Sequence, residues 1–367
     1  MRIAAAHPER QVREALRRAL LAGNGNSVLW MASDQAQARE ACNRDTPDLL
    51  LLDVSLAGSD AAWVRELVKG DICAVMMLAD DPDRAVAGIY EALGHGALGV
   101  AYPPSVGAEG QLNGATQLLA RIERVATLVR RHSPNGTPSG RAGGSAPAGR
   151  LAIVALGAST GGPQALSSIL NALPRGLNAA VIIVQHIEAE FFAGLAQWLS
   201  KSSSLPVCLA KRGQEPQAGV AYLADGTGHL VYLPSGHFSY LSGHRDDLHV
   251  PSVDMLFNSL AENAPAGAAA LLTGMGADGA NGLLKMRQKG WLTIAQDESS
   301  SAVFGMPRAA IQIGAASRIL DVSGIPPVLS SFVSENLPRS TALKQDPREA
   351  PATPLPARSN AGWRSSF

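Results

Sequence analysis

Residues 151–163 read LAIVALGASTGGP and decide the fold of the second half of the chain. Their apolar start, residues 151–156, predicts a buried strand, and the glycine-rich turn leads into a helix that begins near Pro163. The stretch Gly157–Gly161 fits the pattern G-x-S-x-G, in which a tight turn holds a serine hydroxyl clear of the sheet. A helix N-terminus directly behind the serine suits a developing oxyanion. Such turns also bind phosphate, so Ser159 needs partners before it indicates a nucleophile.

Two more apolar strands end on polar residues that complement a serine nucleophile. Residues 179–186 read AAVIIVQH and place His186 at a strand end, where an imidazole can act as a base near neutral pH. Residues 267–279 read GAAALLTGMGADG and place Asp278 in a glycine-rich turn after a third strand. Each residue by itself has an ordinary structural reading, as a strand-end histidine or a turn aspartate. Because the carboxyl ends of parallel strands share one edge, together they predict a triad of Ser159, His186 and Asp278.

The first half of the chain alternates short apolar runs with amphipathic segments over residues 1–131. Val12, Leu16 and Leu20 fall on one face of a predicted helix. Strands that alternate with helices predict a parallel, doubly wound α/β sheet. The strands are expected at residues 3–6, 28–30, 49–53, 74–78 and 98–101.

The composition changes sharply at two further places along the chain. Residues 132–150 are rich in Gly, Ser and Pro and predict a flexible linker. Residues 151–337 then form the expected catalytic domain, also α/β and mostly parallel, after a first domain of residues 1–131. Residues 338–367 are polar and Pro-rich and predict a disordered tail.

The composition speaks against several classes of protein. Lys plus Arg and Asp plus Glu both number 31, so no global basic field exists for nucleic acid. Three widely spaced cysteines and histidines without ligand spacing indicate neither disulfides nor a metal site, and no cofactor is expected. The apolar run in MRIAAAHPER is too short for a signal peptide, and no stretch is long enough for membrane insertion. We therefore expect a soluble, cytoplasmic protein.

The second half resembles the CheB family, the protein-glutamate methylesterases of bacterial chemosensory systems. The resemblance covers residues 151 to about 322 in the family's order. It implies hydrolysis of γ-glutamyl methyl esters on the cytoplasmic domain of methylated chemoreceptors, with release of methanol, and deamidation of receptor glutamines. It also implies a chemosensory histidine kinase as a further partner. The segments that carry it are GASTGGP, IIVQHI, YLADGTGHL, PSVDMLFNSLAE, ALLTGMGADGANGLLKMR and TIAQDESSSAVFGMPRAAI.

The resemblance also assigns roles to individual residues. It makes Ser159 the nucleophile, His186 the general base and Asp278 the partner that orients His186. The family's oxyanion donors are backbone N–H groups, which fall on Thr160 and Met275 in this chain. The implied fold is a doubly wound parallel sheet with a short antiparallel piece.

Three features depart from the family or lie beside its motifs. Glu188 stands where many members have proline and flanks the site, where we expect it to tune receptor preference. The wording YLADGTGHL, residues 222–230, is unusual and is expected to alter a surface hairpin. Asp254 falls in the helical pattern of residues 251–263, and we expect it to cap that helix or to face solvent.

The first half resembles a response-regulator receiver whose phosphorylation site is incomplete. Residues 47–58, PDLLLLDVSLAG, place Asp53 at the acceptor position. Receivers carry an acidic pair after the first strand to hold Mg²⁺, whereas the corresponding stretch here, AAHPE, offers His7. Their switch hydroxyl is replaced by Ala79 and their lysine by Tyr102. Because little then offsets the charge of a phosphoryl group, we expect Asp53 to be phosphorylated poorly or not at all.

Two alternatives stand beside an active methylesterase. A catalytically inactive regulatory scaffold would use the fold only to bind a receptor; the degenerate receiver favours it, and the intact catalytic segments speak against it. An unrelated lipase-like hydrolase is disfavoured because the chain order Ser, His, Asp differs from that of the α/β-hydrolases. The divergent receiver fits a chemosensory system other than flagellar chemotaxis, such as one that controls pili.

Overall fold

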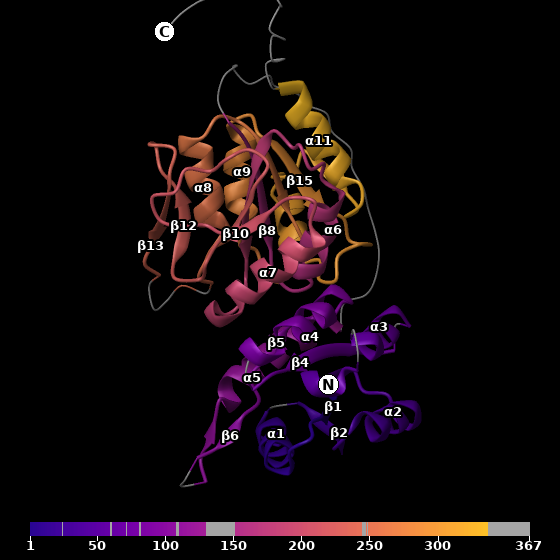
Figure 1. Cartoon of the computed structure of the whole chain (residues 1–367). Helices are drawn as coiled ribbons and strands as arrows, with labels where there is room; N and C mark the ends of the chain where they lie inside the picture. The colour runs from indigo at the N-terminus through magenta and orange to yellow at the C-terminus, as the bar shows by residue number, and fades with distance from the viewer. Residues whose placement is uncertain are drawn as a thin grey trace, which may run out of the picture. The chain divides into compact units, whose positions relative to one another are not determined.

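Two large sheets, of five and seven strands, and two two-stranded sheets form within the part of the chain that the structure describes (Figure 1). The structure is a computed structural model, which describes residues 1–23, 25–58, 61–70, 72–80, 82–107, 110–129, 151–243, 247 and 249–336. The predicted linker, residues 132–150, and the predicted tail, residues 338–367, lie outside the described residues.

The first half forms a five-stranded parallel sheet in the order β2-β1-β3-β4-β5. This order is that of flavodoxin-like folds, in which polar sites form where the order reverses, between β1 and β3. The all-leucine start of β3 is fully buried, as a central strand covered on both faces requires. The doubly wound sheet expected for this half is confirmed. The strands are β1 (Arg2–Ala6), β2 (Ser27–Ala32), β3 (Leu49–Asp53), β4 (Ala74–Leu78) and β5 (Val100–Ala101).

Helices cover both faces of this first sheet. Because successive side chains of a strand point to opposite faces, Ile3 joins Leu16 and Leu20 in one core, whereas Ala4 joins Trp63 in the other. The first of these cores contains residues of α1 and α5, and the second contains residues of α2, α3 and α4. The helices are α1 (Arg10–Ala22), α2 (Gln35–Arg44), α3 (Ala62–Lys69), α4 (Pro82–Gly94) and α5 (Ala115–Val129), and a two-stranded ribbon of β6 (Ser105–Val106) and β7 (Leu112–Asn113) precedes α5.

The second half forms a seven-stranded parallel sheet in the order β10-β11-β9-β8-β14-β15-β16. The chain extends the sheet in one direction from β8 and in the other from β14, so the strand order reverses between these two strands. A ligand site is expected at the carboxyl ends of β8 and β14 for this reason. The strands are β8 (Ala152–Ala158), β9 (Ala179–Gln185), β10 (Val207–Leu209), β11 (Ala221–Leu223), β14 (Ala268–Leu271), β15 (Leu292–Gln296) and β16 (Arg318–Leu320).

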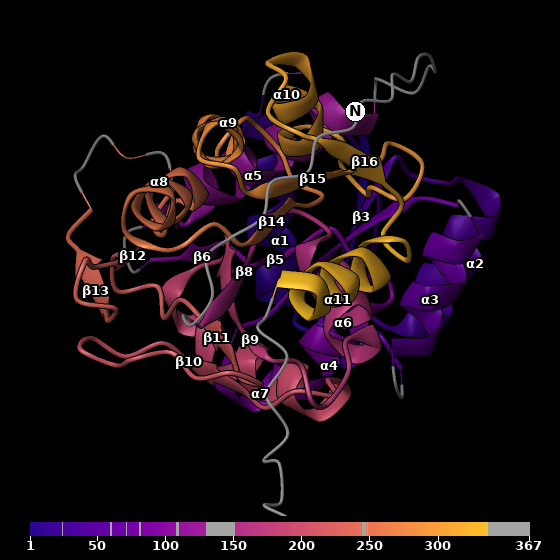
Figure 2. The same cartoon turned by 90° about the horizontal axis from the view of Figure 1, so that it is seen from above.

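Helices also lie on both faces of the second sheet. Figure 2 shows α8, α9 and α10 on one face and α6, α7 and α11 on the other. Helix α8 buries the apolar stripe that its sequence predicts, which includes Val253, Phe257 and Leu260. No helix in the described ranges has the length and apolar character needed to cross a bilayer. The helices are α6 (Gly162–Ala172), α7 (Phe192–Ser202), α8 (Val253–Asn263), α9 (Ala280–Gln288), α10 (Met306–Gln312) and α11 (Ile325–Asn336).

The stretch YLADGTGHL, which we expected to alter a surface hairpin, divides between a buried strand and a hairpin. Tyr222 and Leu223 belong to β11, a buried strand of the seven-stranded sheet. A strand of three residues is too short to show a periodicity, which is why the sequence pattern did not reveal it. The stretch enters a hairpin only at its end, where β12 (His229–Tyr232) pairs with β13 (Phe238–Leu241). This antiparallel pair lies beside α8 and matches the short antiparallel piece of the expected fold (Figure 1).

Candidate active site

Ser159 lies directly after β8, at the turn into α6. Its N–H donates to Thr273 O at 3.0 Å, which ties the turn to the end of β14. Its carbonyl accepts from Gly162 N–H and from Gln185 Nε2, both at 2.8 Å. Gly161 has a φ of +75°, which residues with a Cβ rarely adopt, so the turn requires glycine there. The G-x-S-x-G pattern therefore forms the tight strand-to-helix turn that it predicts.

Gln185, the last residue of β9, connects the serine turn with the histidine. Its Nε2 donates to Ser159 O and, at 3.0 Å, to His186 O. A Cβ on Gly162 would lie 2.0 Å from Gln185 Oε1, so only glycine leaves room for this buried amide. His186 N–H donates to Ala158 O at 3.0 Å and continues the ladder between β8 and β9. The parallel ladder and one amide thus bring Ser159 and His186 to the same sheet edge.

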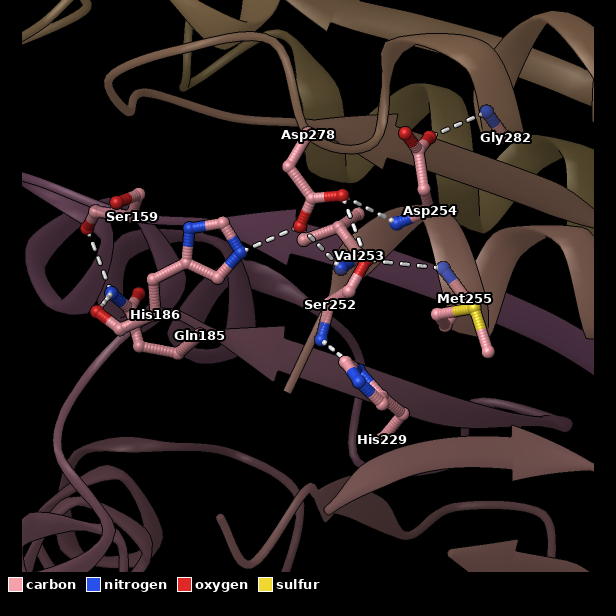
Figure 3. A network of polar contacts seen from close by, with 10 residues as sticks. All are labelled: Ser159, Gln185, His186, His229, Ser252, Val253, Asp254, Met255, Asp278 and Gly282. Carbon is pink, nitrogen blue, oxygen red and sulfur yellow. Dashed lines mark hydrogen bonds and ion pairs between the residues drawn. The ribbon is translucent and has the colours of Figure 1, made fainter. Parts of the chain in front are cut away.

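The His186 ring is hydrogen-bonded through only one of its two nitrogens. Nε2 lies 2.8 Å from Asp278 Oδ2, and the two side chains are only 7% and 11% exposed. Nδ1 is buried and has no hydrogen-bond partner among the described residues. Figure 3 shows Nδ1 on the side of the ring that faces Ser159. The three residues that the sequence singled out are therefore close together, and the open ring nitrogen is the one toward the serine.

Asp278 is held by the N-terminus of α8 (Figure 3). Ser252 Oγ donates to Oδ1 at 2.8 Å, Val253 N–H to Oδ2 at 2.7 Å, and Asp254 N–H to Oδ1 at 3.0 Å. Burial by itself raises the pKa of Asp278, but the hydrogen bond and charge of His186, together with the N–H groups, hold that pKa well below its ordinary value. Asp278 is therefore ionised near neutral pH and accepts a hydrogen bond from His186.

Asp254 shapes the edge of the site and is half-buried. Its Oδ1 accepts from Gly282 N–H at 2.6 Å, while its own N–H donates to Asp278. Burial raises the pKa of Asp254, and the negative charge of Asp278 acts in the same direction. The expectation of a solvent-facing residue is wrong because α9 packs against this polar side of α8. Only the contact between the two helices, which the sequence pattern does not show, brings Gly282 to Asp254.

Two histidines that sequence spacing left without a role belong to the same network. His229 Nδ1 accepts from Ser252 N–H at 3.1 Å (Figure 3). Its Nε2 lies 3.0 Å from Asp247 Oδ2. The His249 ring stacks on His186, with centroids 4.1 Å apart and planes 8° apart. Sequence reasoning missed both because no spacing rule relates them to the triad. The available signal was the run of polar residues just before α8, which includes His249 and Ser252.

The two residues expected to supply oxyanion donors line the same cavity as the triad serine and histidine. Thr160, Met275, Ser159 and His186 all contribute to a cavity of about 860 Å³. Within the described ranges, the N–H groups of Thr160 and Met275 donate to no protein acceptor. A Cβ on Gly274 would lie 2.6 Å from Ser159 Cβ, so this glycine lets the Met275 turn approach the serine. Two open N–H groups beside Ser159 are the donor type that an oxyanion requires.

Side chains of the first half contact the segment that follows His186. Arg121 of α5 donates two hydrogen bonds to Glu188, one of them at 2.9 Å. The Tyr90 hydroxyl of α4 donates to Phe191 O, and the Tyr102 and Phe191 ring centroids lie 5.9 Å apart. Glu188, which the sequence placed beside the site, is therefore the ion-pair partner of Arg121.

Asp53 at the end of β3 lies beside His7, just after β1. His7 Nε2 is 3.3 Å from Asp53 Oδ2 and 3.5 Å from Asp80 Oδ2. These atoms could group around a metal ion, since all lie within 4.8 Å of one another. However, Glu9 N–H donates to His7 Nδ1 at 3.1 Å, so Nε2 carries the ring proton and has no free lone pair. Mg²⁺ prefers oxygen ligands, so these residues do not fit the magnesium site of a receiver.

The remaining positions around Asp53 also differ from those of a receiver. Asp53 Oδ1 accepts from the N–H of Ser55 at 3.0 Å and from its hydroxyl. Burial raises the pKa of Asp53, but the hydrogen bonds from His7 and Ser55 outweigh it and lower that pKa. Ala79 is buried directly after β4, and Tyr102 follows β5. The structure thus places an aliphatic and a phenolic side chain where receivers have a hydroxyl and a lysine.

Comparisons with known proteins match both the catalytic half and most of the chain. The family described as CheB methylesterase matches residues 154–329. Protein-glutamate methylesterase/protein-glutamine glutaminase 1 of Pseudomonas fluorescens is 41% identical over 319 residues, which are 86% of this chain and 94% of the relative. A relative of the same kind from Burkholderia thailandensis is 41% identical over 89% of this chain and 96% of its own length. The crystal structure of the Thermotoga maritima CheB methylesterase catalytic domain is 34% identical and covers 50% of this chain and 98% of that chain, with a TM-score of 0.47.

The fold and these relatives first define the class of the protein, which is a hydrolase with an α/β catalytic domain. More narrowly, the chain belongs to the CheB family of protein-glutamate methylesterase/protein-glutamine glutaminases. The enzyme class expected from the sequence is confirmed.

Proposed function

We propose that the second half hydrolyses γ-glutamyl methyl esters on the cytoplasmic domain of methylated chemoreceptors through Ser159, His186 and Asp278. The observation that supports this most is the state of the His186 ring. Asp278 engages Nε2 at 2.8 Å, while Nδ1 is buried, without a partner among the described residues, on the side that faces Ser159. A histidine held in this way is poised to accept a proton from a neighbouring hydroxyl.

The reaction follows from these positions. Ser159 Oγ attacks the ester carbonyl carbon as its proton passes to His186 Nδ1, and Asp278 stabilises the imidazolium that forms. The N–H groups of Thr160 and Met275 bind the oxyanion of the tetrahedral intermediate. Its collapse breaks the bond to the methoxy oxygen, which takes the proton from His186 and leaves as methanol. Water, deprotonated by His186, then releases the glutamate carboxylate and restores Ser159.

The same machinery accounts for a second reaction on receptor glutamines. An amide carbonyl can take the place of the ester carbonyl, and His186 then protonates the departing nitrogen so that ammonia leaves. The acyl-enzyme is identical in the two reactions, so both yield glutamate. The relatives carry both activities in their names, protein-glutamate methylesterase and protein-glutamine glutaminase.

A cytoplasmic receptor domain as substrate implies a cytoplasmic protein. We propose a chemosensory histidine kinase as its further partner. Methanol release from a methylated receptor fragment, measured with the full chain, tests the proposal. We expect release by the wild type, none above background by Ser159→Ala, and unchanged release by Ser168→Ala, which removes an exposed hydroxyl from α6. Absence of release by the wild type would favour the receptor-binding scaffold instead.

We further infer that Asp53 is not a phosphoryl acceptor in this protein. The supporting observation is that His7 faces its carboxylate where receivers hold Mg²⁺. Without the metal ion and the lysine, little offsets the charge of the transferred group. Incubation with acetyl phosphate and Mg²⁺, followed by intact-mass analysis, should show no added phosphate. Stoichiometric phosphorylation that Asp53→Asn abolishes would overturn this inference.

A further inference from the structure

We propose that His249 is a positioning residue that fixes the plane of the catalytic imidazole by stacking on it. The two rings are nearly parallel, 8° apart, with centroids separated by 4.1 Å. Rings stacked in this way are in van der Waals contact across their faces and do not hydrogen-bond to each other. The contact therefore acts on how the His186 ring is oriented and not on which atoms it donates to. This inference deepens the proposed function and rests on it.

His186 needs such a support because its hydrogen bonds do not determine the ring orientation. The torsion about the Cβ–Cγ bond of histidine is broad, so the plane of the ring has to be set by its surroundings. Nε2 is bonded to Asp278, but Nδ1 has no partner among the described residues. One hydrogen bond leaves the ring free to tilt about the Nε2–Oδ2 axis. A flat neighbour across one face removes that freedom and keeps Nδ1 toward Ser159.

The chain carries His249 on the same short segment that holds Asp278. Three residues after His249, the N-terminus of α8 begins with Ser252, whose hydroxyl and following N–H groups bind the Asp278 carboxylate. His229 anchors this segment, since its Nδ1 accepts from Ser252 N–H and its Nε2 faces Asp247. One element, residues 249–254, thus sets both the carboxylate and the ring plane of the dyad. A displacement of this element would misalign both at once.

The test replaces His249 in the full chain with residues that separate the effect of a flat ring from the effect of the imidazole group. His249→Phe keeps a flat ring and removes the imidazole, whereas His249→Ala removes the ring and His249→Leu keeps apolar bulk without planarity. Because small misplacements of catalytic groups are costly, we expect kcat of the alanine and leucine variants to fall about ten- to a hundredfold with KM changed less than about twofold. The phenylalanine variant should recover to within about threefold of the wild type. His237→Ala, in the turn between β12 and β13, is the matched control and should leave both constants unchanged.

A second readout does not depend on activity. In the stack, each ring shields the C–H protons of the other, so the His186 ring signals in NMR spectra of histidine-labelled protein should move downfield in His249→Ala and stay near their wild-type positions in His249→Phe. Loss of a signal in His186→Gln assigns it. If the alanine variant does not fold, the leucine and phenylalanine variants carry the comparison.

Several outcomes would overturn the proposal. One is a wild-type kcat in His249→Ala or His249→Leu, and another is a phenylalanine variant as slow as the alanine variant. A rise in KM with unchanged kcat would assign His249 to substrate binding instead. Failure of the wild type to release methanol counts against the proposed function alone, because the NMR shifts still decide whether the stack exists.

Discussion

Each of the two sheets places an aspartate at the carboxyl end of a central strand with a histidine beside it. In the second sheet, Asp278 accepts from His186 Nε2 and from three donors at the start of α8. In the first sheet, Asp53 has His7 at 3.3 Å and its hydrogen bonds to Ser55. The same pair of residue types therefore occurs at topologically equivalent edges.

The surroundings decide what each pair can do. His186 keeps one buried nitrogen open toward a serine, with two open N–H groups nearby. The second nitrogen of His7 is occupied, because it accepts from Glu9 N–H. A His–Asp pair becomes a base only when the far nitrogen of the ring is available. A position at the end of a strand brings the histidine close to the aspartate. The partner of the second ring nitrogen then determines whether the histidine can act as a base.

The largest effect that tests this comparison is the loss of the proposed nucleophile and the proposed base. Ser159→Ala and His186→Ala should each lower kcat by about 10⁴- to 10⁶-fold, and the double variant should cost little more than either, because the two act as a unit. Methanol release under substrate saturation measures all three. If the two single losses multiply in the double variant, the residues act independently and the triad assignment is wrong.

Asp278→Asn should have the next largest effect and lower kcat by about 10³- to 10⁴-fold. An asparagine cannot stabilise the imidazolium of His186, and its N–H₂ group would face donors at either position, Ser252 and Asp254 at Oδ1 or Val253 and His186 at Oδ2. Asp321→Asn is the control, since among the described residues the Asp321 carboxylate accepts only from Ser323 and Gly324 of its own loop. Activity of Asp278→Asn close to that of the wild type would remove Asp278 from the mechanism.

The first sheet offers the reverse test, in which chemistry is added. A variant with His7→Asp, Ala79→Thr and Tyr102→Lys supplies the metal ligand, hydroxyl and cation that Asp53 lacks. We expect at least about a tenfold rise in phosphate incorporation from acetyl phosphate over the wild type, dependent on Mg²⁺. Adding Asp53→Asn to this variant should abolish the gain. Equal labelling of the variant and the wild type would mean that these three positions do not determine whether Asp53 accepts a phosphoryl group.

The pH dependence of the free energy of unfolding should distinguish Asp278 from an ordinary surface carboxylate. The folded pKa of Asp278 lies below its unfolded value of about 3.9, so its contribution to the free energy of unfolding is present above about pH 4 and is lost as the pH falls toward the folded pKa. The loss is at most about 1.4 kcal/mol for each pH unit in that window. Urea unfolding of the wild type and Asp278→Asn between pH 3 and 7 measures it. If the difference in free energy of unfolding between the wild type and Asp278→Asn stays constant down to pH 3, the folded pKa of Asp278 is not lowered.

The smallest expected effect concerns His7 and has the opposite sign. Burial lowers the pKa of His7, but the hydrogen bond and charge of Asp53, and then the charge of Asp80, outweigh it and raise that pKa. The stability that protonated His7 adds is therefore present below its unfolded pKa of about 6.5 and is lost as the pH rises through the folded pKa. We expect the free energy of unfolding of the wild type to exceed that of His7→Asn by more at pH 6 than at pH 9. Urea unfolding with parallel pH series checks this, and a larger difference at pH 9 would refute it.

Sequence patterns predicted the five strands of the first large sheet and three strands of the second, β8, β9 and β14, but not the contacts that support the proposed triad. Apolar runs that end in a polar residue are local signals. Ser159 and His186 directly follow β8 and β9, and Asp278 stands in the glycine-rich turn after β14. Asp254 and His229 act through contacts between α8, α9 and the β12–β13 hairpin, which depend on how these elements pack. No periodicity encodes that packing. The absence of a receiver lysine at Tyr102 was readable from the sequence, whereas the Glu9 bond that closes the His7 ring nitrogen required coordinates.

The position of β14 between β8 and β15 has a consequence for how the protein folds during its synthesis on the ribosome. His186 and Asp278 are 92 residues apart, so at about 5–20 residues per second the base is made roughly 5–20 s before its carboxylate. Throughout that interval one edge of β8 has no strand to pair with, which exposes an apolar, aggregation-prone edge in the nascent chain. The dyad cannot assemble before this gap closes. The yield of the enzyme in a cell should therefore depend on how well chaperones protect the half-made sheet.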